Sequence, residues 1–185
     1  MEKKINKIFV FLFLLLFTFK ISALELNSEK YILYNLNENK VLLEKDSHVQ
    51  TDIASLTKIM TILLAVEHTD DYSKQVTITK EMLDVIALDV AVVGFKKGKK
   101  VTYDDLLYGA MLESGADATN ALAILVSGNK KDFVQKMNEK ARELNLQNTS
   151  FANVVGLYDK NNYSSAYDMA ELLKYALKNP KYKEL

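Results

Sequence analysis

Two Ser-x-x-Lys sequences place a hydroxyl and an amine at a spacing that could support nucleophilic catalysis. They are Ser55 with Lys58 and Ser127 with Lys130. A serine hydroxyl is a poor nucleophile until a neighbouring base takes its proton. A lysine amine can be that base when burial or a second cation lowers its pKa. The spacing alone arises by chance in a chain of this composition. The residues around each pair must therefore decide which pair could be catalytic.

The surroundings favour Ser55 and Lys58. Apolar residues recur with a period of 3.6 and predict a helix from about Ser55 to His68. Positions i and i+3 share one face of a helix, so the Lys58 amine can approach the Ser55 hydroxyl. Backbone N–H groups at a helix start also favour a developing oxyanion. On spacing alone, an N-cap serine beside a surface lysine stays open as the alternative.

Two other polar segments predict solvated turns. Residues 127–129 read Ser-Gly-Asn, a turn sequence that leads into a lysine-rich helix start. Residues 96–100 hold four lysines and a glycine without interleaved aromatic side chains. The whole chain balances 24 basic against 24 acidic side chains, which gives no general attraction to nucleic acid. We therefore expect no nucleic-acid partner.

Composition excludes several other kinds of site. The 185 residues contain no cysteine, which rules out a disulfide scaffold, a thiolate metal site, a cysteine nucleophile and an iron–sulfur cluster. Two histidines, His48 and His68, are too few for a histidine-rich metal centre. We therefore expect neither a cofactor nor a metal ion.

The N-terminus has the pattern of a secretory signal. Three lysines among residues 1–7 precede twelve uncharged residues, 8–19, and Ala23 supplies a small side chain before a cut. Twelve residues fall short of the ~20 that span a bilayer as a helix. We expect residues 1–23 to be a signal peptide and residues 24–185 to form one exported domain, in the periplasm or at the cell-wall face. No stable membrane anchor is evident after cleavage.

The elements around Ser55 are a hairpin and then helices. Short β-prone runs at 30–35 and 40–45 flank a turn-rich segment and predict a β-hairpin. Residues 76–78 predict a short strand or loop, and a brief helix follows near 81–86. Thr102 with two acids after it predicts a helix start, and Ser114-Gly115 predicts its break. Three more helices are predicted, at 117–126, around 133–144, and at about 165–177 before Asn179-Pro180.

Four ordered blocks of this sequence resemble one enzyme family. Residues 52–61 closely resemble the nucleophile segment of the low-molecular-mass penicillin-binding proteins. These are the serine D-alanyl-D-alanine carboxypeptidases of peptidase family S11. Residues 97–107 and 113–123 are similar to the approach to the family's second motif and to that motif itself. Gly156-Leu157 and the segment 164–170 match a further signature. The resemblance spans about residues 29–182, and the chain is identified as a member of this family.

The resemblance implies a fold and a set of roles. The fold class would be α+β, a DD-peptidase/β-lactamase-like fold with an antiparallel sheet and a helical subdomain. Ser55 would form the acyl-enzyme, Lys58 would accept its proton, and Ser114 would help to pass a proton to the leaving group. The substrate would be a peptidoglycan stem peptide ending in D-Ala-D-Ala, and β-lactams would acylate the same serine. A β-lactamase is the less favoured alternative, because the block around Asp168 resembles the peptidases.

The sequence departs from the family pattern at three places. Ala116 stands where the second motif usually has Asn, and a lost hydrogen-bond partner typically costs ~1–3 kcal/mol. Val155 stands where members often carry His. No Lys-Thr-Gly triplet, which in the family lies on a strand well beyond the Asp168 block, occurs in the 185 residues.

These departures shape what we expect of the protein. The chain is expected to be the N-terminal portion of a carboxypeptidase, with the C-terminal strands of the sheet missing and the activity impaired. The 30–45 hairpin would then keep an unpaired edge and an uncovered apolar face. The alternative function is a non-catalytic cell-wall binding or scaffold remnant of the same fold. Covalent acylation of Ser55 would separate the two.

Overall fold

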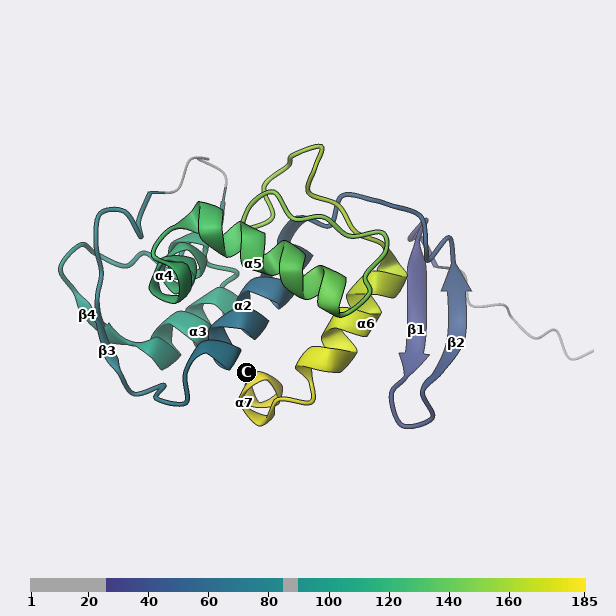
Figure 1. Cartoon of the computed structure of the whole chain (residues 1–185), viewed down its shortest axis with the longest axis horizontal. Helices are drawn as coiled ribbons and strands as arrows, with labels where there is room; N and C mark the ends of the chain where they lie inside the picture. Colours follow the sequence, from purple (N-terminus) through teal and green to yellow (C-terminus); the bar gives the residue numbers. More distant parts are fainter. Residues whose placement is uncertain (1–25, 85–89) are drawn as a thin grey trace, which may run out of the picture.

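The computed structural model describes residues 26–84 and 90–185 (Figure 1). The predicted signal peptide, residues 1–23, lies outside the described residues. Within the described ranges, no helix is both long enough and apolar enough to cross a membrane. The architecture is α+β, as expected: a helical body carries a two-stranded β-ribbon at each end of its long axis.

The helix after Ser55 forms the centre of the body. Helix α2 (Thr57–His68) buries eight of its twelve residues, including Met60 and Leu63, which have no exposed surface. It contacts four longer helices and the short C-terminal helix α7. A helix that is apolar on most of its circumference belongs inside a core, which is where α2 lies. The longer neighbours are α3 (Tyr103–Leu112), α4 (Ala116–Ser127), α5 (Lys130–Glu143) and α6 (Ala166–Ala176).

Local sequence sets the ends of the helices that flank the site. The Thr102 hydroxyl accepts a hydrogen bond from Asp105 N at 3.0 Å, and the Asp105 carboxylate accepts one from Thr102 N at 2.7 Å. This reciprocal capping box starts α3 where the sequence predicted it. Helix α4 ends at Gly128, whose φ of 79° lies in the left-handed region that favours glycine. The predicted breaks at residues 114–115 and 128 are therefore confirmed.

Each of the two β-ribbons is an antiparallel pair of strands. Strands β1 (Tyr31–Asn35) and β2 (Lys40–Lys45) form the predicted hairpin. Strands β3 (Gln75–Thr77) and β4 (Lys100–Thr102) form a second pair, with Val76 opposite Val101. The sequence pattern predicts β3 as a strand or loop and does not predict β4. Figure 1 shows the two ribbons at opposite ends of the molecule.

One local prediction is wrong. The brief helix expected near 81–86 is replaced, where it is described, by turns that join Leu83 N to Lys80 O and Asp84 N to Glu81 O; residues 85–89 lie outside the description. The predicted end of the helix before Asn179-Pro180 is confirmed, since α6 ends at Ala176, but a short helix that was not predicted, α7 (Pro180–Glu184), follows it. Proline suits the first helical position, and the Asn179 side chain caps the new helix.

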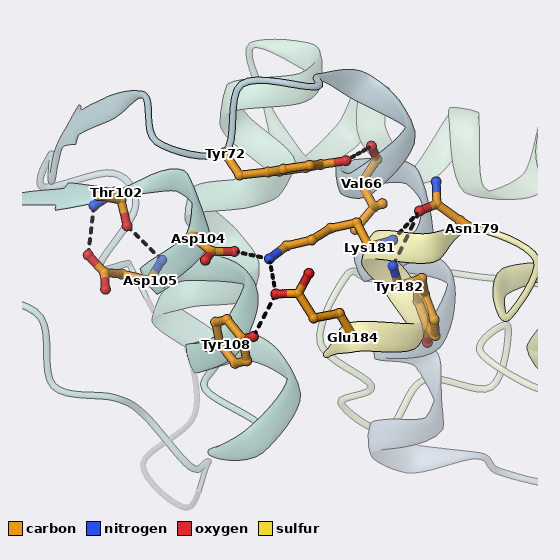
Figure 2. Close-up of polar contacts among 10 residues, drawn as sticks. All are labelled: Val66, Tyr72, Thr102, Asp104, Asp105, Tyr108, Asn179, Lys181, Tyr182 and Glu184. Atoms are coloured by element: carbon orange, nitrogen blue, oxygen red, sulfur yellow. Dashed lines mark hydrogen bonds and ion pairs between the residues drawn. The ribbon is translucent and has the colours of Figure 1, made fainter.

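A partly buried lysine, Lys181, fixes α7 against the start of α3 (Figure 2). The Lys181 amine lies 2.7 Å from an Asp104 carboxylate oxygen and 2.8 Å from a Glu184 carboxylate oxygen. The Tyr108 hydroxyl donates to the same Glu184 oxygen at 3.0 Å. The Lys181 amine also lies 5.3 Å from the centre of the Tyr72 ring. These contacts hold the last described helix close to α2 and α3.

The β1–β2 hairpin is joined to the body mainly through α6. The Lys174 amine donates to Asn39 at 3.0 Å and to the Tyr34 hydroxyl at 3.2 Å, and it lies 4.8 Å from the centre of the Tyr34 ring. Leu33 and Leu42 each leave 52% of their surface exposed. In the part of the chain that the structure describes, this sheet has two strands and adds no residue to the buried core.

Candidate active site

Ser55 lies in a strained turn at the entrance to α2. The turn is a 3-10 helix, Ala54–Leu56, that continues directly into α2. Ala54 has a φ of 42°, a left-handed conformation that is uncommon for residues other than glycine, and its N–H donates to Asp52 at 3.1 Å. Strain of this kind is frequent at functional sites. The turn leaves the Ser55 side chain exposed, whereas Lys58 is buried.

Gly156 packs directly against this turn. It has a φ of 89°, and a Cβ atom at this position would lie 1.9 Å from the Ala54 carbonyl oxygen. No side chain fits there, so glycine is required both for the backbone conformation and for the close approach. The loop around Gly156 therefore touches the segment that presents the Ser55 hydroxyl.

Lys58 has the properties expected of a proton acceptor. Its amine lies 3.2 Å from Ser55 Oγ and donates to the Val155 carbonyl oxygen at 2.7 Å. The residue is only 7% exposed. Burial disfavours the charged amine and lowers the pKa of Lys58 to about 8. The amine can therefore lose its proton near neutral pH while the Val155 carbonyl keeps it oriented toward Ser55.

Ser114 brings a second hydroxyl to Ser55 from the segment between α3 and α4. It lies between α3 and α4, with a φ of 52°, and its hydroxyl donates to Ser55 Oγ at 3.2 Å. The three side chains, Ser55, Lys58 and Ser114, line one cleft of about 140 Å³. Three residues that were selected from the sequence are thus brought together. A hydroxyl flanked by a buried amine and a second hydroxyl can be activated for attack on a carbonyl carbon.

The two departures within the described chain have different consequences in the structure. Val155 takes part through its backbone carbonyl, which any residue type supplies, so its replacement of histidine leaves the contact to Lys58 intact. Ala116 is buried and lines the cleft, where it presents a methyl group. The cleft therefore lacks the amide that an asparagine would provide at this position.

Asn153 is a positioning residue that the sequence analysis missed. Its side-chain oxygen accepts hydrogen bonds from the N–H groups of Val155, Gly156 and Leu157, at 3.2, 2.7 and 3.0 Å. Its side-chain amide donates to Leu157 O at 2.8 Å. These bonds shape the loop that carries the carbonyl for Lys58. An asparagine shortly before a glycine is a turn signal that could have indicated it.

Asp117 is a second positioning residue, interpreted from the sequence only as part of a helix start. The residue is 3% exposed, and its carboxylate accepts hydrogen bonds from the N–H groups of Val93, Gly94 and Phe95, at 2.9, 2.9 and 3.1 Å. The loop that it holds also includes Ala91, which lines the cleft. Asp117 thus ties one wall of the cleft to the start of α4.

The second Ser-x-x-Lys pair is not part of the cleft. Lys130 donates to the carbonyl of Asp84 at 3.2 Å. The segment 127–129 turns at an exposed Gly128, as expected of a solvated turn, but the Ser127 hydroxyl itself is buried and has no hydrogen-bond partner among the described residues. The same ranges, 26–84 and 90–185, contain no group of three or more acidic or histidine side chains that could hold a metal ion.

Comparisons with known proteins identify the family of this chain. The family model for D-alanyl-D-alanine carboxypeptidases of peptidase family S11 matches residues 18–185. The chain is 39% identical over 159 residues to D-alanyl-D-alanine carboxypeptidase DacF of Bacillus subtilis, covering 83% of this chain and 41% of that protein. It is 35% identical over 157 residues to DacA of Escherichia coli, covering 79% of this chain and 38% of the relative.

Solved structures show the same likeness. Penicillin binding protein 6B of Escherichia coli superimposes with a TM-score of 0.81 at 29% identity, covering 89% of this chain and 54% of that structure. Penicillin binding protein 5 of Haemophilus influenzae gives a TM-score of 0.79 at 29% identity, covering 87% and 48%. The chain spans about 40% of the length of the curated relatives it matches. With a family model that matches nearly its whole length, the chain belongs to the D-alanyl-D-alanine carboxypeptidase family, peptidase S11.

Proposed function

We propose that this chain carries the nucleophile of a serine D-Ala-D-Ala carboxypeptidase that trims the terminal D-alanine from peptidoglycan stem peptides. One observation carries the proposal: Ser55 Oγ lies 3.2 Å from both the Lys58 amine and the Ser114 hydroxyl. The relatives named above are D-alanyl-D-alanine carboxypeptidases, which supports the same substrate class. The exported location follows the predicted signal peptide, residues 1–23, and residues 24–185 belong to the peptidase domain.

The chemistry would proceed through an acyl-enzyme. The Ser55 oxygen attacks the carbonyl carbon of the penultimate D-alanine, and its proton passes to the neutral amine of Lys58. The carbon–nitrogen bond then breaks, and the leaving amine takes a proton relayed through the Ser114 hydroxyl. Water hydrolyses the resulting ester and restores Ser55. A β-lactam would acylate the same oxygen by opening its ring amide.

A second function is favoured by one feature of the cleft. Ala116 presents a methyl group where the family motif has an amide. The missing amide favours a protein that binds cell-wall peptides on this fold without turning them over. The two functions differ in one observable, which is the formation of a covalent bond at Ser55.

The deciding experiment is labelling of the purified chain with a fluorescent penicillin. We expect a covalent band that is absent in Ser55→Ala and retained in Ser127→Ala, which alters the serine of the other Ser-x-x-Lys pair. Circular dichroism must show that all three proteins are folded. A folded wild-type chain that takes no label would eliminate the acylating function and leave the binding function. A band that persists in Ser55→Ala would place the nucleophile elsewhere.

A further inference from the structure

Five exposed lysines gather at the end of the molecule that carries the β3–β4 ribbon. Three of them lie in the turn before β4, one is the first residue of β4, and one follows β3. Figure 1 places this ribbon at the opposite end of the long axis from the β1–β2 hairpin. The five, which we call the lysine end, are Lys80, Lys96, Lys97, Lys99 and Lys100.

Backbone hydrogen bonds hold the two lysine-bearing segments side by side. Ile78 N donates to Lys99 O at 2.9 Å, and Gly98 N donates to Ile78 O at 2.8 Å. Lys99 N closes the turn on Lys96 O at 3.0 Å. Gly98, with a φ of 82°, permits this turn. The lysine end is therefore a defined structure and not a loose run of charges.

The charges of the lysine end are not neutralised by ion pairs. Salt bridges within the described residues involve Lys140, Lys174 and Lys181, and none involves a lysine of this group. Asp105 and Glu113 line one hollow with Lys99 and Lys100 but form no ion pair with them, and the Asp105 carboxylate accepts from Thr102 N. The whole chain has a net charge of zero, so the lysine end is a region of positive charge on a protein that is neutral overall.

We propose that the lysine end binds a flexible, phosphate-bearing polyanion. Lysine amines are compact point charges that suit phosphate groups and do not require a fixed approach geometry. Lys96, Lys97 and Lys99 lie around the Gly98 turn, Lys100 begins β4, and Lys80 follows β3. A flexible polymer can follow amines that come from a turn and from two separate segments, whereas a planar surface requires them to share one face.

The aromatic content of this region argues against a nucleic acid as the polymer. Single-stranded nucleic acids gain much of their affinity from bases stacked on exposed aromatic rings. Two aromatic rings line the hollow beside Lys99 and Lys100. Phe95 packs against the core beside Gly109. The Tyr108 hydroxyl donates to Glu184, and its ring lies 5.2 Å from the Lys181 amine. The recognition is therefore of the charged backbone alone. It involves no step at Ser55 and stands independently of the proposed peptidase function.

The test measures binding of end-labelled inorganic polyphosphate to the purified chain by fluorescence anisotropy over a range of salt concentrations. One variant carries Lys96→Gln, Lys97→Gln, Lys99→Gln and Lys100→Gln. A matched control carries Lys45→Gln, Lys136→Gln, Lys160→Gln and Lys183→Gln, which remove the same charge from exposed positions on other elements. Circular dichroism verifies that both variants fold.

We expect the first variant to bind about tenfold more weakly at low salt and to show a shallower dependence on salt, because fewer counterions are released. The control should stay within about twofold of the wild type. An equal loss in both variants would overturn the proposal, since net charge alone would then explain binding. Absence of binding by the wild type at low salt would overturn it as well. Vesicles rich in anionic phospholipid provide the remaining arm, and tighter lysine-dependent binding to them would assign the surface to a membrane instead.

Discussion

The helical body buries its leucines, whereas the β1–β2 hairpin leaves leucines exposed. Leu63, Leu106 and Leu122 in the body have no exposed surface, whereas Leu33 and Leu42 in the hairpin are half exposed. All three proposed catalytic side chains belong to the body or to loops packed against it. The difference teaches that the geometry around Ser55 depends on α2, α3 and α4, and that the hairpin contributes little to holding it.

The sharpest test of this contrast replaces a leucine in each region. Leu63→Ala removes a fully buried side chain and should lower the free energy of unfolding by about 3 kcal/mol. Leu33→Ala removes a side chain that is already half in water and should change it by less than about 0.5 kcal/mol. Urea denaturation followed by circular dichroism measures both. Equal losses would show that the hairpin and the body form one cooperative core.

A second test adds a methyl group where the loop meets the nucleophile turn. Gly156→Ala should cost about 2–3 kcal/mol and abolish penicillin labelling, because its Cβ would overlap the Ala54 carbonyl. Gly128→Ala is the matched control: its φ is also positive, but its Cβ would meet open space. The control should cost about 1 kcal/mol and keep labelling. Similar labelling by the two variants would contradict the close approach.

The protonation of Lys58 gives a third test within the body. Because burial lowers its pKa to about 8, the neutral amine should increase about tenfold per pH unit below pH 8. The rate of penicillin labelling should follow this rise and level off above pH 8. In the unfolded chain Lys58 keeps its proton up to its ordinary pKa of 10.5, so between pH 8 and 10.5 this group should make folding more favourable as pH rises. A flat profile between pH 6 and 9 would exclude Lys58 as the base.

Ala116 allows a gain of function to be tested. Ala116→Asn would add an amide to the cleft that Ser55 and Lys58 line. A new hydrogen bond to the bound ligand is worth about 1 kcal/mol, so labelling should become about fivefold faster. Ala123→Asn, at another fully buried alanine of α4, should destabilise the helix without faster labelling. An unchanged rate in a folded Ala116→Asn protein would show that the missing amide does not limit acylation.

The smallest effect is expected where the hairpin meets α6. Lys174→Met removes the contacts to Asn39 and Tyr34 but keeps much of the apolar stem, and it should cost about 0.5 kcal/mol. Hydrogen exchange at the β1–β2 amides should accelerate, while penicillin labelling should stay unchanged. A loss of labelling would show that the hairpin supports the site after all.

Local signals in the sequence were sufficient for most helices, whereas the resemblance to the family was needed to select Ser114 and to decide in favour of Ser55 and Lys58. The capping box at Thr102, the turn at Gly128 and the apolar period after Ser55 each act within a few residues, so each can be read directly. Asn179-Pro180 shows where such local prediction stops, because the same pair can end one helix and also begin the next.

Contacts between distant segments could not be read in this way. Gly156 is required because it meets Ala54, about a hundred residues earlier in the chain, and no local pattern announces that approach. The carbonyl that orients Lys58 belongs to the backbone of Val155, and any residue type would supply it, so the sequence does not indicate this contact. The role of Asp117 likewise depends on a loop that precedes it by more than twenty residues.

Asp117 has a consequence for how the protein could be observed in solution. Three consecutive amides, of Val93, Gly94 and Phe95, lie outside any helix or strand yet donate to one buried carboxylate. Such amides should take up deuterium slowly, in the way that core helices do, whereas an undocked loop would exchange within moments. Their exchange would therefore report the free energy of opening that wall of the cleft, with no substrate, inhibitor or turnover needed to see it.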